Sequence, residues 1–121
     1  IVNLVSKLGF DENVFVTHSN VAVDIIPKGH NKYRGLKHVC NGEKLIGIAD
    51  SMNDYPLIAY SDYSFIPKIA SDKLIDKLRK NGFCVHQMND FDDNCVLQSN
   101  YGETEGVLDA LKFINRMNQN I

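Results

Sequence analysis

The feature that most constrains the fold is a continuous apolar run that leads directly into acidic and amide side chains. The run is KLIGIAD, residues 44–50, and SMND follows it over residues 51–54. A strand without polar alternation is typical of a parallel sheet that helices cover on both faces. We therefore expect Asp50 at the carboxyl end of a buried strand, with Asn53 and Asp54 close behind it.

The segments after residue 30 alternate between helical and extended patterns. Helices are expected over residues 32–40, 55–60, 72–80 and 104–117, and further strands over residues 63–66 and 83–88. Asn31 and Ser71 precede two of these helices and suit the capping position. The apolar residues that we expect to face inward from the last helix are Val107, Leu108, Leu111 and Ile114. Strands that alternate with helices predict an α/β fold, a Rossmann-like parallel sheet with flanking helices.

The beginning of the chain has a different pattern. Residues 1–8 carry apolar side chains at helical spacing, and residues 14–17 and 21–26 are β-branched and aromatic runs around a polar turn. These runs predict a helix followed by a β-hairpin. We therefore expect a boundary between residues 1–27 and residues 28–121.

Charge and hydropathy narrow the classes of partner. The formal net charge is -2, from 15 acidic and 13 basic residues, so no overall basic field is present to bind nucleic acid. The apolar runs are too short to span a bilayer, and the first residues lack the features of a signal peptide. We expect a cytoplasmic protein that binds neither nucleic acid nor membrane.

Three cysteines, Cys40, Cys84 and Cys95, make an odd count without a CxxC pair. This favours reduced thiols over a disulfide framework. Cys84 and His86 share a strand face and Cys95 follows, which leaves a zinc site open as an alternative. Half-buried structural residues are the favoured interpretation, because no fourth ligand has suitable spacing.

The polar residues around Asp50 have the chemistry of a magnesium and phosphate site. Carboxylate and amide oxygens are ligands that Mg²⁺ uses, and Asp50, Asn53 and Asp54 lie within one turn of each other. Lys32 begins the helix that precedes this strand, where its charge adds to free backbone N–H groups. The alternative is that Asp50 merely caps the next helix in a polar turn.

Three segments match the spacing of known motifs. They are IIPKGHNKYRGL (residues 25–36), ADSMNDYPL (residues 49–57) and GETEGVLDAL (residues 102–111). The chain resembles haloacid dehalogenase superfamily phosphatases, especially the Cof-like and sugar-phosphate phosphatase branch, whose corresponding patterns are IxPxGxxKxxxL, GDxxNDxxM and a closing xxGVxxxL. Ala49 and Leu57 replace the usual Gly and Met. The resemblance implies that residues 1–27 end a cap domain and that residues 28–121 form the C-terminal part of the catalytic core.

The resemblance also implies residue roles. Asp50 would bind Mg²⁺ directly, Asp54 would support the metal through water, and Asn53 would contact the phosphate or the loop that carries the nucleophile. Lys32 would neutralise the phosphoryl group. The implied enzyme is a Mg²⁺-dependent phosphatase that acts on a small phosphorylated metabolite, such as a sugar phosphate, through an aspartyl-phosphate intermediate.

The nucleophile of that family lies in an early D-x-D-x-[T/V] motif, which the residues before 30 do not contain. The D-x-D at residues 90–92 follows the Asp50 segment and fits a solvated acidic turn better. We therefore expect the nucleophile outside this chain, in a missing N-terminal half or another copy of the chain. The isolated chain is expected to be inactive. The alternatives are a non-catalytic truncated or interaction module, or one half of a split enzyme.

Overall fold

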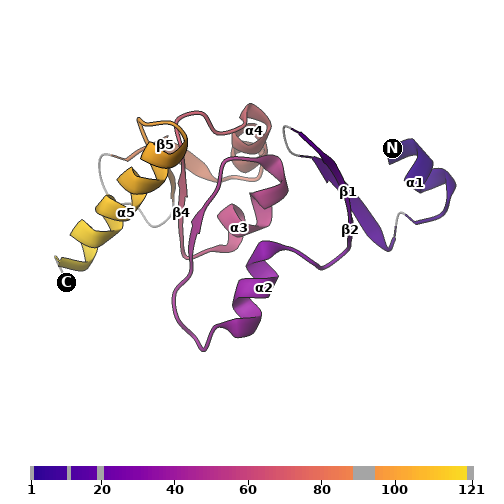
Figure 1. Ribbon diagram of the computed structural model, residues 1–121, viewed down its shortest axis with the longest axis horizontal. Coiled ribbons are helices and arrows are strands. Elements are labelled where there is room, and N and C mark those ends of the chain that lie inside the picture. The colour runs from indigo at the N-terminus through magenta and orange to yellow at the C-terminus, as the bar shows by residue number, and fades with distance from the viewer. Residues whose placement is uncertain (1, 11, 19–20, 89–94, 120–121) are drawn as a thin grey trace.

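The computed structural model describes residues 2–10, 12–18, 21–88 and 95–119, and these form two separate sheets with flanking helices (Figure 1). Helix α1 (Val2–Lys7) comes first, and strands β1 (Val14–His18) and β2 (Val23–Pro27) then pair antiparallel. The predicted helix and hairpin are therefore confirmed, with the second strand starting at Val23. The domain boundary after residue 27 stays a prediction.

The remaining strands form one parallel sheet in the order β3-β4-β6-β5. They are β3 (Ile46–Ile48), β4 (Tyr63–Ile66), β5 (Cys84–Gln87) and β6 (Cys95–Gln98). The helical elements are α2 (Lys32–Val39), the 3₁₀ turn η1 (Met52–Asp54), α3 (Tyr55–Tyr60), α4 (Asp72–Lys80) and α5 (Glu103–Gln119). All three strand pairs are parallel, so the carboxyl ends lie along one edge, and the predicted α/β fold is confirmed. Among the described residues, no helix is both long and apolar enough to cross a membrane.

The core has two layers, one on each face of this sheet, because neighbouring side chains of a strand point to opposite faces. Ile66 and Val96 pack toward α3 and α4, where Leu74 is fully buried. On the other face Phe65 packs against α5. Its ring lies edge-on to that of Phe113, with 6.0 Å between the two ring centres. Figure 1 shows α5 on one side of β4, and α3 and α4 on the other.

Strand β3 is more exposed than its sequence predicts. It lies at the end of the sheet in the described part of the chain, and Ile46 is 40% exposed. A strand in the interior of a sheet is also shielded by a paired strand along each of its two edges. In the described part of the chain β3 pairs with β4 alone. The parallel pairing was predicted correctly, whereas the complete burial of residues 44–50 was not.

The prediction for the buried face of α5 is wrong for three of its four residues. Val107, Leu108 and Leu111 are exposed, and Ile114 alone packs partly against the core. The residues of α5 that are buried against the sheet belong to a second stripe, Gly106, Ala110 and Phe113. The helix therefore carries two apolar stripes, and helical periodicity cannot show which of them the sheet covers.

Strand β6 has no counterpart among the predicted elements, although it lies in the middle of the sheet. Parallel neighbours usually need a long crossover that contains a helix, but residues 88–94 alone join β5 to β6. The strand is also only 4 residues long, and its last residue, Gln98, is polar. The acidic segment at residues 90–92 lies outside the described residues.

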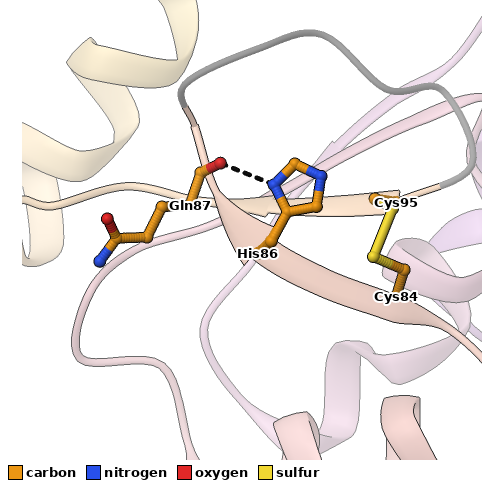
Figure 2. Close-up of a disulfide and its surroundings, with 4 residues drawn as sticks. All are labelled: Cys84, His86, Gln87 and Cys95. Atoms are coloured by element: carbon orange, nitrogen blue, oxygen red, sulfur yellow. Dashed lines mark hydrogen bonds between the residues drawn. A yellow bond between two sulfur atoms is a disulfide. The ribbon is translucent and has the colours of Figure 1, made fainter.

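The expectation of reduced thiols is wrong for two of the three cysteines. Cys84 and Cys95 are the first residues of β5 and β6, they are register partners, and they form a disulfide (Figure 2). Their Cα atoms lie 4.6 Å apart, within the range that a disulfide can bridge. Cys40 is the free cysteine of the described residues. The odd number of cysteines does not predict this disulfide, because its formation depends on the register of β5 and β6.

We predict that Gly47→Ala lowers the free energy of unfolding by about 1–3 kcal/mol, the usual cost of overpacking. A Cβ atom at Gly47 would lie 2.7 Å from the Leu57 carbonyl oxygen and 2.9 Å from Ser61 Oγ. Helix α3 would then have to move away from β3. Denaturant unfolding measures the change. Gly35→Ala is the control, because that position in α2 is open and the same substitution should not destabilise the protein.

Candidate active site

Asp50 lies just beyond the carboxyl end of β3, as the sequence predicts. The Ala49 N–H donates to the Phe65 carbonyl oxygen at 3.3 Å, which extends the contact between β3 and β4. The Asp50 carbonyl oxygen accepts a hydrogen bond of 2.7 Å from the Ser71 N–H at the start of α4. Two elements therefore hold the backbone of Asp50, while its side chain is exposed and open to a ligand.

Asp54 is buried, and it follows Asp50 by four residues. It is the last residue of η1 and is 8% exposed. Asp54 stands at the N-cap position of α3 but makes no capping hydrogen bond, and Ser51 holds the N-cap position of η1. The alternative in which Asp50 caps the next helix is therefore wrong.

Lys32 and Asp54 form an ion pair although they are far apart in the sequence. Lys32 Nζ lies 2.6 Å from Asp54 Oδ1, and the two side chains are 65% and 10% exposed. Asn31 positions the lysine, because its side chain accepts a hydrogen bond of 2.9 Å from the Arg34 N–H and caps α2 as predicted. A mostly buried carboxylate thus meets a cation that still reaches solvent.

The side chain of Asn53, the fourth predicted site residue, is hydrogen-bonded within its own turn. Its side-chain oxygen accepts a hydrogen bond from the Ser51 hydroxyl, and both residues are half-buried. This bond ties the side chain to its own turn. The structure therefore brings Lys32, Asp50 and Asp54 to one edge of the sheet, and it places Asn53 beside them in a turn that fixes its amide.

A cavity of about 240 Å³ opens at this edge. Its lining residues are Ile48, Ala49, Asp50, Asp54, Pro67, Glu103 and Val107. Three of them are carboxylates that come from two separate segments of the chain, the β3–α3 connection and the start of α5. The other four described lining residues are apolar.

Glu103 is the lining carboxylate that sequence reasoning missed. It is the first residue of α5 and has a φ of 47°, in the left-handed region that non-glycine residues rarely adopt. Such backbone strain concentrates at functional sites. Gly106 brings this end of α5 close to the sheet, since a Cβ there would lie 2.8 Å from Pro67 Cβ. Residues 102–111 carry a motif in the sequence, but no pattern in that motif marks Glu103.

Tyr55, the neighbour of Asp54, adds no charge to the site at neutral pH. Burial raises the pKa of its phenol above the usual range, and Tyr60 raises it further, against a hydrogen bond with Asn81 that lowers it. The Lys77 ammonium lies 4.3 Å from the centre of the Tyr55 ring. The phenol therefore stays protonated.

The donor set fits a hard divalent cation. Asp50 offers an exposed carboxylate, and Asp54 and Glu103 offer two more in the lining of the same cavity. Mg²⁺ prefers oxygen ligands and commonly binds through one or two carboxylates, with water and phosphate oxygens in its other positions. Asp50 and Asp54 are the residues that would hold it.

Comparison with known proteins yields two matches. Residues 3–98 match the family model of haloacid dehalogenase-like hydrolases. A solved structure described as a HAD/COF-like hydrolase from Plasmodium vivax is similar, with a TM-score of 0.65 and 19% sequence identity. The alignment covers 96% of this chain and 37% of that one, so the chain spans well under half of that protein. This likeness shows the fold alone. No curated protein matches the chain.

Proposed function

Because the chain belongs to the haloacid dehalogenase-like hydrolases, we propose that it is the C-terminal part of a Mg²⁺-dependent phosphatase. The substrate would be a small phosphorylated metabolite, such as a sugar phosphate. The observation that carries the proposal is the Lys32–Asp54 ion pair, whose aspartate lines the same cavity as the exposed Asp50 carboxylate at the carboxyl ends of a parallel sheet. This edge is where open α/β sheets bind ligands.

In the proposed reaction each of these side chains has a separate task. A bound Mg²⁺ would offset negative charge on the phosphoryl oxygens. Asp50 and Asp54 would hold the metal, and Lys32 would keep Asp54 in place while its exposed ammonium faces the phosphoryl group. Asn53, held by Ser51, would orient the phosphate. A carboxylate outside this chain would attack phosphorus, and the bond from phosphorus to the alcohol oxygen would break while that oxygen takes a proton from solvent. Water would then attack the aspartyl-phosphate and release phosphate, the free carboxylate and a proton.

Basic side chains near the start of α2 support an anionic substrate. A second cavity of about 550 Å³ is lined by Lys28, Gly29, His30, Asn31, Arg34, Gly35 and His38. Four of these residues carry basic groups, and the described lining includes no carboxylate. Lys32 lies in the same stretch of chain, so a substrate whose phosphate reaches it would pass a positive surface.

The first test is phosphate release by the complete protein. Incubated with a panel of sugar phosphates and other small phosphate monoesters, it should hydrolyse at least one of them with Mg²⁺, and excess EDTA should abolish turnover. Readdition of Mg²⁺ after removal of the chelator should restore it. Turnover that is unaffected by chelation would contradict the proposed metal dependence, and no hydrolysis of any ester would favour a non-catalytic module.

The isolated 121-residue chain is expected to be inactive and to self-associate. It lacks the predicted nucleophile, and α5 exposes an apolar stripe in which Leu108 is 50% and Leu111 is 52% exposed. Phosphate release and sedimentation velocity measure the two properties. Turnover that Asp92→Asn abolishes would mean that residues 90–92 hold the nucleophile. A monomer at high concentration would contradict the interpretation of α5.

A further inference from the structure

Three side chains with metal-binding atoms meet on the neighbouring strands β5 and β6. The ligand atoms of Cys84, His86 and Cys95 all lie within 4.8 Å of one another. Cys84 and His86 alternate along β5 and so share a face, and Cys95 is the register partner of Cys84 on β6. Figure 2 shows the imidazole of His86 beside the two cysteines. Strand register thus assembles a cluster that sequence spacing alone does not define.

The imidazole of His86 is held in the form that binds metals. Its Nδ1 lies 2.7 Å from the carbonyl oxygen of Gln87. A carbonyl oxygen can only accept, so Nδ1 carries the proton and the lone pair of a neutral ring is on Nε2. Histidine ligands of metals commonly donate their other ring N–H to a backbone carbonyl in this way. The ring is therefore oriented before any metal binds.

We propose that Cys84, Cys95 and His86 form a zinc site in the reduced protein, and that the disulfide is the alternative state of the same two sulfurs. Two thiolates and an imidazole are donors that favour zinc over Mg²⁺. Water would occupy the fourth position, as in zinc sites with three protein ligands. Two sulfurs on one tetrahedral zinc lie about 3.8 Å apart. The paired strands can supply this separation by side-chain rotation.

Conversion between the two states is a two-electron exchange. A thiol reductant such as glutathione breaks the S–S bond, two reductant thiols become one disulfide, and their two protons and two electrons give two cysteine thiols. Zinc then displaces both protons and binds the thiolates. In the opposite direction glutathione disulfide takes two electrons from the two thiolates and two protons from water to become two thiols, the protein S–S bond forms, and Zn²⁺ is released. A disulfide is expected in oxidising surroundings and a metal site in reducing ones.

The position of the cluster separates it from the proposed catalysis. Cys84 and Cys95 begin their strands, whereas Asp50 follows the end of β3, so the two cysteines lie at the amino ends of the parallel strands and Asp50 lies at the carboxyl ends. Strand β5 is the last strand of the sheet and pairs only with β6 in the described chain. Zinc would therefore attach an edge strand to its neighbour and stabilise the fold, as the disulfide does.

The test is cobalt titration of the complete protein after a phosphine has reduced it and both phosphine and oxygen have been removed. Tetrahedral Co²⁺ bound to thiolates gives an intense sulfur-to-metal charge-transfer band, which carboxylate sites do not. We expect this band at one equivalent, its loss on addition of Zn²⁺, and a rise in the melting temperature with Zn²⁺. Without reduction the band should be absent.

Variants distinguish the three-ligand site from other thiols. Cys95→Ser should abolish the band. His86→Asn keeps both cysteines and should weaken zinc binding by at least about tenfold, because loss of a residue that only hydrogen-bonds to a metal ligand already lowers metal affinity by about 10–100-fold. Cys40→Ser and His38→Asn are the matched controls and should bind as the parent does. The proposal is overturned if the reduced parent shows no band, if unreduced protein shows the same band, or if His86→Asn binds zinc as tightly as the parent.

Discussion

Asp50→Asn in the complete protein is expected to lower turnover of a phosphate monoester by about two to three orders of magnitude. Asn keeps the size of the side chain but removes one charge from the proposed metal site. A bound metal supplies several kcal/mol of transition-state stabilisation, and each 1.36 kcal/mol is a factor of ten in rate. Because the Asp50 side chain is exposed, the melting temperature should change little.

Steady-state turnover as a function of Mg²⁺ concentration, with a thermal melt of each variant, measures this effect. Higher Mg²⁺ should rescue part of the lost activity, because an amide oxygen is still a ligand, although a weaker one. Asp76→Asn is the matched control, an exposed aspartate of α4 away from the cavity, and it should behave as the parent does. Near-normal turnover of Asp50→Asn would refute the metal assignment, and unfolding would mean that Asp50 is structural.

Lys32→Met is expected to lower turnover by about 10²–10³-fold, the usual effect of removing one group that stabilises transition-state charge. Met keeps much of the lysine stem but removes the ammonium that lies 2.6 Å from Asp54. The lysine is 65% exposed, but Asp54 is only 10% exposed, so the substitution leaves a mostly buried carboxylate unpaired and should cost about 1–3 kcal/mol of stability. Turnover and thermal unfolding separate the two effects.

The double variant Asp50→Asn/Lys32→Met tests whether the two residues serve one transition state. If they do, its defect should be much smaller than the product of the single defects. Lys37→Met is the matched control, because it removes another exposed lysine from α2 that has no place in the proposed site. A Lys32→Met variant that turns over substrate normally would show that its ion pair is structural only.

The candidate site was predictable from the sequence to the extent that it depends on local order. Asp50, Asn53 and Asp54 follow a strand directly, so any parallel sheet that contains β3 presents them at its carboxyl edge. The pairing of Lys32 with Asp54 required that α2 pack beside η1 and α3, and Glu103 joins the cavity only because α5 returns to the same edge. The roles of these residues in catalysis stay predictions.

The sequence by itself determined the elements whose signals are local. The bounds of α3 and β4 and the Asn31 cap of α2 match the predictions, because apolar spacing and capping act over a few residues. Ser71 occupies the N-cap position of α4 as predicted, although its side chain makes no capping hydrogen bond.

The tertiary structure alone decided which segments became neighbours. It placed β6 between β4 and β5, chose the Ala110 stripe of α5 over the Leu108 stripe, and joined Cys84 to Cys95. Each of these outcomes depends on sheet order and strand register, which are set by the packing of residues far apart in the chain. Periodicity shows that a segment has an apolar face, but only the competition among all such faces for the same core determines which one is buried.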